Sequence, residues 1–116
     1  MYSVTKRIEI AGSHRLQLPY DSPCQRLHGH NWIISVEVIS GVLTTQGMVV
    51  DFTSISKVVK QLDHRDLNEI FTFNPTAENI AKWIFDNVKK NLDNPHAEVS
   101  KVTVQESEGN IACYTR

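Results

Sequence analysis

Apolar and polar residues alternate along several segments of the chain. The alternation runs through residues 2–11 and returns from the histidine-containing segment 28–40 onward, with apolar side chains at every second position. Strict alternation of this kind is typical of a β-strand that buries one face. The same pattern predicts a third strand around residues 102–106 and a final strand at 111–115, joined by a short turn that contains Gly109.

The period of the pattern changes between the second and third strands. From Phe52 to Leu62 the apolar residues recur at helical spacing, and Asp51 is a suitable N-cap. A second helix begins at Thr76, its predicted N-cap, and stops by Asn94-Pro95. The order strand, strand, helix, helix, strand, strand predicts an α+β fold, in which two helices cover one face of a four-stranded antiparallel sheet. Such an open sheet has two exposed edges, and joining several sheets into a barrel would pair them, so we expect an oligomer.

Composition narrows the range of functions. The chain has 116 residues, which we expect to form one domain over residues 1–116, and its net charge is −1. This balance gives no electrostatic case for nucleic acid or an anionic membrane as partner. We find no apolar run of membrane-spanning length and no signal peptide. Two cysteines are a poor disulfide framework, so we expect reduced thiols and a cytoplasmic protein.

The most informative stretch is Cys24-Gln25-Arg26-Leu27-His28-Gly29-His30. Side chains two residues apart in an extended segment share a face, so His28 and His30 can reach one ion, and both share parity with the apolar face of their strand. His14 offers a third imidazole. The three histidines could be unrelated hydrogen-bonding residues, or they could form a zinc site that keeps its fourth position open, as catalysis requires. Cys24 is then either a fourth ligand that closes the site or a free thiol beside it.

Other candidate residues have both a chemical and a structural interpretation. Asp63 beside His64 could form a proton relay, in which the carboxylate fixes the tautomer of the imidazole. Alternatively, His64 is a favourable cation at a helix C-terminus. Glu106 shares parity with an apolar strand face and could accept two N–H groups from a planar heterocycle, or could be a solvated residue at a strand end. We interpret Cys113 as structural.

Taken together, several motifs resemble the 6-pyruvoyltetrahydropterin synthase superfamily over essentially the whole chain. The motifs are His14-Arg15-Leu16, Cys24-x-x-x-His28-Gly29-His30, Gly47-Met48-Val49-Val50-Asp51-Phe52, Leu62-Asp63-His64, Asn74-Pro75-Thr76-Ala77-Glu78-Asn79 and Gln105-Glu106-Ser107. The three-residue gap before His28 is similar to that of the bacterial 6-carboxytetrahydropterin synthases of queuosine biosynthesis. The animal-type 6-pyruvoyl enzymes usually have a longer gap.

The resemblance implies a tunnelling fold (T-fold), in which sheets from several subunits close a barrel and two trimers stack into a homohexamer with active sites between subunits. It implies dihydroneopterin triphosphate as the small-molecule pterin substrate and Zn²⁺ as the cofactor. By this resemblance, His14, His28 and His30 would bind zinc, and Cys24 would be the general base. Asp63 and His64 would form the proton relay. Glu106 would anchor the pterin ring, and Thr76 would contribute to the same pocket.

Two departures from the family pattern stand near these residues. Ile10 and Gly12 replace the usual aromatic residue and alanine before His14, which affects ring packing near the pterin. Ala77 replaces the second threonine of some longer relatives. Arg15, Arg26 and Lys101 are the candidates to hold the triphosphate, and the sequence does not rank them.

The implied reaction releases triphosphate and acetaldehyde and leaves 6-carboxytetrahydropterin, so the protein would be a zinc-dependent lyase. The nearest alternative is 6-pyruvoyltetrahydropterin synthesis, which does not cleave the carbon–carbon bond. Two further alternatives are a zinc hydrolase that does not need Cys24, and a structural zinc module closed by Cys24 and three histidines.

Overall fold

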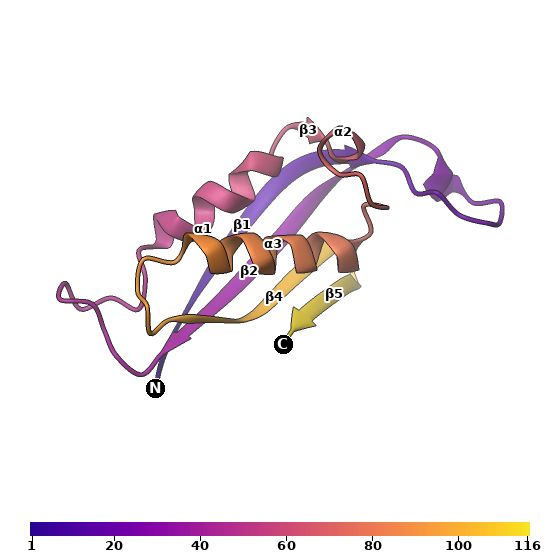
Figure 1. Ribbon diagram of the computed structural model, residues 1–116. Coiled ribbons are helices and arrows are strands. Elements are labelled where there is room, and N and C mark those ends of the chain that lie inside the picture. Colours follow the sequence, from indigo (N-terminus) through magenta and orange to yellow (C-terminus); the bar gives the residue numbers. More distant parts are fainter.

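The computed structural model describes residues 1–116 and shows one long, twisted sheet with its helices on one face (Figure 1). The strands β1 (Tyr2–His14), β2 (His28–Ser40), β4 (Glu98–Ser107) and β5 (Asn110–Thr115) are antiparallel neighbours in that order. These are the four predicted strands, and the predicted α+β class is confirmed. The first strand extends three residues beyond its predicted end and therefore includes His14.

The sheet has five strands rather than the four predicted. The additional strand, β3 (Arg65–Asp66), pairs in parallel with Gly12 and Ser13 at the outer edge of β1, so the sheet is mixed. Two residues are too few to produce an alternating pattern, because the strand exists only through its pairing with β1. Beyond this contact, the outer edges of β1 and β5 have no neighbouring strand in the chain.

Three α-helices lie against the sheet: α1 (Phe52–Val59), α2 (Leu67–Ile70) and α3 (Ala77–Asn91). Both predicted caps are confirmed, since the Asp51 carboxylate accepts from Thr53 N–H and the Thr76 hydroxyl accepts from Asn79 N–H. The first helix tightens into a 3₁₀ turn, η2 (Lys60–Leu62), before it ends. The single-turn helix α2 was not predicted. A second 3₁₀ turn, η1 (Pro23–Gln25), lies in the β1–β2 connection. None of the helices combines the length and apolar character that a bilayer crossing needs.

The core lies between the sheet and the two longer helices. Alternate residues of β1, β2 and β4 are buried, and they meet the apolar faces of α1 and α3. Burying one large apolar side chain contributes roughly 1.5–3 kcal/mol. The fully buried aliphatic residues at this interface include Ile34, Val36, Val102, Val104, Ile55, Val59, Ile80, Ile84 and Val88. The core ends at the C-terminal end of β1, where polar residues take over the same face.

Candidate metal centre and proton-transfer groups

Three strands bring three imidazoles and one carboxylate together at the end of the core. His14 pairs directly opposite His28 in the β1–β2 register, and His30 lies two residues along the same face of β2. Glu106 arrives from β4 with the parity of the buried Val104. One candidate ligand atom from each of the four side chains lies within 4.8 Å of the others. The parity that the sequence predicted therefore does gather the three histidines.

Backbone carbonyls fix the orientation of two of these rings. Nδ1 of His14 donates a hydrogen bond to the carbonyl of Pro75 at 2.7 Å, and Nδ1 of His28 donates to the carbonyl of Arg26 at 2.7 Å. A carbonyl can only accept, so each Nδ1 carries the hydrogen and each Nε2 carries a lone pair. This is the arrangement found in metal sites, where the partner of the second ring nitrogen orients the ligand.

Two buried imidazole nitrogens in the centre face the carboxylate of Glu106. Oε1 of Glu106 lies 3.0 Å from Nε2 of His14 and 3.3 Å from Nε2 of His30. Both nitrogens are buried and have no hydrogen-bond partner. Burial lowers the pKa of both rings, more than the nearby Glu106 carboxylate raises it, and this favours neutral imidazoles. A cation bound between these unpartnered nitrogens and the carboxylate would satisfy both, so the residues fit a metal ion bound by nitrogen and oxygen.

Trp32 packs against two of the imidazoles of this centre. Its ring centroid lies 4.8 Å from that of His14 and 5.3 Å from that of His30, both edge to face, and its Nε1 donates to the carbonyl of Gly12 at 3.1 Å. A Cβ atom on Gly12 would lie 3.3 Å from Trp32 Nε1 and 3.5 Å from Leu67. The glycine thus gives room to a large indole. The sequence pattern identified Trp32 only as an apolar strand residue.

Asp63 and His64 form the predicted pair at the end of η2. Asp63 Oδ1 accepts from Ala11 N–H at 2.9 Å and lies 3.0 Å from His64 Nδ1. The Ala11 hydrogen bond is the main reason that the pKa of Asp63 is lowered. Adjacent residues can meet in this way because His64 has a positive φ of 57° and its N–H donates to the Ala11 carbonyl at 2.7 Å.

The imidazole of His64 is open to solvent, with 82% of its side chain exposed. It borders a hollow of about 450 Å³ that is also lined by His30, Gly12 and Gly29. Ala11, Ser13 and Asn31 line the same hollow, and strand alternation puts their side chains on the face of the sheet opposite His14 and His30. The hollow therefore lies beside His64 on the face away from the histidine cluster.

Cys24 and Thr76 lie on the connections around the cluster. Cys24 is half-buried in η1 and is not one of the four clustered residues, while Cys113 is exposed on β5. Thr76 directly follows Pro75 and uses its hydroxyl oxygen as the cap of α3. The fourth residue beside the three histidines is thus Glu106 rather than Cys24, whereas the sequence pattern suggested only a ring anchor or a solvated residue at that position.

Comparison with protein families gives a match over residues 3–116 to the family described as 6-pyruvoyl tetrahydropterin synthase. The chain belongs to this family. The proteins that the chain resembles are named for different activities. A 6-carboxy-5,6,7,8-tetrahydropterin synthase of Bacillus subtilis is 31% identical over 100 residues, which cover 79% of this chain and 68% of that protein.

Two further proteins that the chain resembles carry other names. A dihydroneopterin monophosphate aldolase of Pyrococcus furiosus is 47% identical over 72 residues, covering 59% of this chain and 60% of that protein. The chain spans less than two thirds of this aldolase and 36% of a putative 6-carboxy-5,6,7,8-tetrahydropterin synthase of Pyrococcus horikoshii. The structure of Caenorhabditis elegans 6-pyruvoyl tetrahydropterin synthase superimposes with a TM-score of 0.82 and 28% identity, over 99% of this chain and 95% of that one.

The sequence pattern did not predict the groups that orient the side chains of the site. The carbonyls of Pro75 and Arg26, the backbone of Ala11 and the indole of Trp32 carry no chemical motif of their own. Only the folded arrangement reveals them. A proline before the Thr76 cap was visible in the sequence, but its contact with His14 spans 61 positions.

Proposed function

We propose that the protein is a zinc-dependent lyase that converts 7,8-dihydroneopterin triphosphate into 6-carboxytetrahydropterin, with release of acetaldehyde and triphosphate. The observation that carries the proposal is the set of neutral, buried imidazole nitrogens of His14 and His30 beside His28. Family membership supports a pterin substrate, and the B. subtilis relative supports the carboxy product. The three-residue gap between Cys24 and His28 supports the same choice.

His14, His28 and His30 would hold the zinc ion through Nε2. When bound, zinc supplies Lewis-acid stabilisation of negative charge on substrate oxygen. The carbonyls of Pro75 and Arg26 hold Nδ1 of His14 and His28, so Nε2 of each ring would be free to bind the ion. Trp32 excludes water from the protein side of the site, since it is only 1% exposed.

Proton transfer would be shared between Cys24 and His64. Cys24 is the general base, and it acts as a thiolate that takes a proton from a side-chain carbon. Asp63 holds Nδ1–H of His64, so Nε2 of that ring is the atom that accepts or returns a proton. The exposure of His64 lets it exchange this proton with water.

Glu106 is the proposed anchor for the pterin ring, because a carboxylate can accept two adjacent N–H groups bidentately. One of its oxygens lies 3.0 Å from Nε2 of His14 and 3.3 Å from Nε2 of His30, so the anchored ring would lie beside the histidine cluster. Thr76 would contribute a hydroxyl hydrogen to the same pocket, since its oxygen already serves the helix cap.

The proposal includes a homo-oligomer, a dimer of trimers with active sites between subunits, working in cytoplasmic queuosine biosynthesis. The unpaired outer edges of β1 and β5 support association, because exposed strand edges in small sheets are usually paired or covered. Size-exclusion chromatography with light scattering measures the assembly directly. A monomer that is fully active would contradict this part of the proposal.

The decisive experiment is product identification. Zinc-loaded protein is incubated with dihydroneopterin triphosphate, and the products are identified by mass spectrometry together with an assay for acetaldehyde. The proposal predicts 6-carboxytetrahydropterin and acetaldehyde in equal amounts. A pyruvoyl product without acetaldehyde would establish the 6-pyruvoyl reaction instead.

A second candidate is aldol cleavage of dihydroneopterin monophosphate, which the 47% identity to the P. furiosus aldolase favours. Here the bond between the first two side-chain carbons breaks, which leaves a hydroxymethyl pterin and a phosphorylated two-carbon aldehyde. The same base and relay would serve. Turnover of the monophosphate at a higher kcat/KM than the triphosphate would select this reaction.

A further inference from the structure

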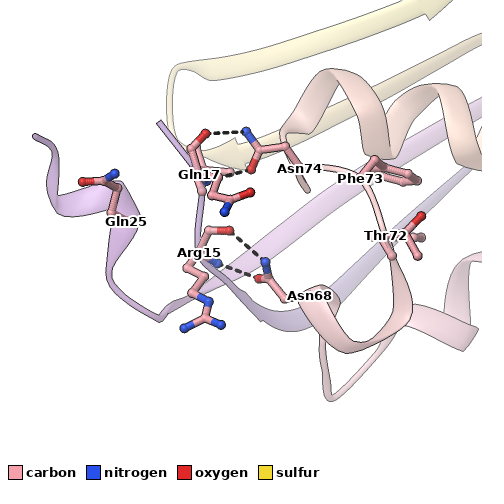
Figure 2. Close-up of a pocket in the computed structure, with 9 residues that line it drawn as sticks. Arg15, Gln17, Gln25, Asn68, Thr72, Phe73 and Asn74 are labelled. Atoms are coloured by element: carbon pink, nitrogen blue, oxygen red, sulfur yellow. Dashed lines mark hydrogen bonds between the residues drawn. The ribbon is translucent and has the colours of Figure 1, made fainter. Parts of the chain in front are cut away.

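Beyond the end of β1 the chain continues as an extended segment, Arg15–Gln17, whose outer edge is held by two asparagine side chains. Asn68 accepts from Arg15 N–H at 2.8 Å and donates to the Arg15 carbonyl at 3.0 Å. Asn74 accepts from Gln17 N–H at 3.0 Å and donates to the Gln17 carbonyl at 3.1 Å. Figure 2 shows both pairs side by side.

The two amides imitate a neighbouring strand. In an antiparallel ladder, one residue exchanges both of its backbone hydrogen bonds with a single partner, and the next such residue lies two positions on. Arg15 and Gln17 have this spacing, and each has one amide as its partner. We call Asn68 and Asn74 the asparagine clamp.

The backbone of Cys24 is bonded to the other side of the clamped segment. Leu16, which lies between the two clamped residues, donates its N–H to the carbonyl of Cys24 at 2.7 Å. Gln25 adds a second tie, from its side-chain amide to the carbonyl of Leu18 at 2.9 Å. The clamped segment is thus hydrogen-bonded on both sides, to the asparagine clamp on one side and to the backbone of Cys24 on the other.

The clamp is also connected to the other site residues. Asn68 follows the Asp63–His64 pair by a few residues and stands in α2. Asn74 directly precedes Pro75, whose carbonyl orients His14. The segments that place the histidine cluster and the relay therefore also place the cysteine, which comes from a different connection of the fold.

We propose that Asn68 and Asn74 are positioning residues that set the place of Cys24 relative to the histidine cluster through Arg15–Gln17. The chemical importance of that placement rests on the proposed function, in which Cys24 is the general base. A displacement of about 1 Å in a reacting group can lower a rate by about a hundredfold. The clamp would prevent such a displacement in a connection that has little other secondary structure.

The test uses graded variants of the clamp in the full, zinc-loaded protein. Asn68→Asp keeps the acceptor for Arg15 N–H and loses the donor, whereas Asn68→Leu and Asn74→Leu lose both hydrogen bonds. Asn91→Leu is the matched control, because its amide donates to the Ser54 carbonyl away from the site. The first readout is hydrogen exchange at the Leu16 amide, and the second is the alkylation rate of Cys24 relative to Cys113 by iodoacetamide.

We expect Leu16 exchange to accelerate about tenfold in the leucine variants and less in Asn68→Asp, since fewer hydrogen bonds are lost. Cys24 alkylation should rise relative to that of Cys113 as the connection loosens. With a pterin substrate, kcat should fall about tenfold to a hundredfold while zinc content stays unchanged. The control should match the wild type in every readout.

Two results would overturn the proposal. One is unchanged Leu16 exchange in both leucine variants, which would show that the clamp does not hold the segment. The other is faster Leu16 exchange with unchanged Cys24 alkylation and kcat, which would show that the clamp holds the segment without positioning Cys24. If no pterin is turned over by the wild type, the proposed function fails, while the exchange and alkylation measurements still decide the role of the clamp.

Discussion

Nε2 of His14 and Oε1 of Glu106 lie 3.0 Å apart, and because Nδ1 of His14 donates its hydrogen to the Pro75 carbonyl, the neutral ring presents a lone pair to the carboxylate. The contact is unfavourable in the metal-free chain because two acceptors face each other. Glu106→Gln supplies an N–H₂ group to His14, so the metal-free variant should be more stable than the wild type by about 1 kcal/mol. Urea unfolding after treatment with a chelator measures this difference.

The control for that substitution is Glu108→Gln, which removes the same charge from the exposed β4–β5 turn. Its free energy of unfolding should equal that of the wild type. In the zinc-loaded protein, Glu106→Gln should raise KM for the pterin, because the ring loses its bidentate acceptor. A destabilised metal-free Glu106→Gln variant would contradict the lone-pair assignment.

The metal-free protein should lose stability as the pH falls below about 6.5. Burial lowers the pKa of His14 and His30 in the folded chain, so the unfolded chain takes up protons first. Their contribution is fully present above the unfolded pKa and is lost as the pH falls towards the folded pKa, with a slope of at most about 1.4 kcal/mol per pH unit for each histidine. Urea unfolding at pH 7.5, 6.5 and 5.5 tests the sign. The exposed His96→Gln variant should keep the same slope, and a pH-independent stability would refute the prediction.

Cys24→Ala should lower kcat by about a thousandfold, since general base catalysis typically contributes 10²–10⁴-fold. Its zinc content should remain near that of the wild type, because the cysteine lies outside the histidine cluster. Cys113→Ala, on the exposed face of β5, should change neither quantity. Metal analysis and steady-state kinetics give both values. Loss of zinc from Cys24→Ala would mark Cys24 as a ligand.

Asp63→Asn should reduce kcat by about a hundredfold, because it removes the carboxylate that fixes the tautomer of His64. The amide oxygen can still accept from Ala11 N–H, so the fold should be retained. Asp86→Asn is a matched control, since Asp86 pairs only with Lys82 on the surface of α3. Equal kcat values for the two variants would exclude a relay through Asp63.

Gly12→Ala should destabilise the protein by about 1–2 kcal/mol, because its Cβ would lie 3.3 Å from Trp32 Nε1. Trp32→Phe opens space at that point, so the alanine should cost less in the Trp32→Phe background. A double-mutant cycle by urea unfolding measures the coupling. Additive effects would show that the glycine and the indole are independent.

Much of the fold follows from local patterns. The alternation of β1, β2, β4 and β5 and the caps at Asp51 and Thr76 are properties of a few neighbouring residues each, so the sequence displays them. β3 and α2 depend instead on contacts with the region around the end of β1, which lies more than fifty positions away in the sequence. No local pattern predicts them.

The candidate site divides in the same way. The shared face of His28 and His30 is a matter of strand parity, which can be counted along the chain. The approach of Glu106 to His14 depends on the register between β2 and β4, which only the assembled sheet defines. The groups behind the histidines are backbone carbonyls, and every residue has one, so composition gives no signal for them.

The direct pairing of His14 with His28 has a consequence for how the sheet forms. β1 and β2 are each 13 residues long, and such a ribbon could pair in more than one alignment. A slip of one position would turn His28 and His30 to the opposite face from His14. An ion that requires three imidazoles on one side would bind only the native alignment, so metal captured early would select against misaligned ribbons before the helices close over the sheet.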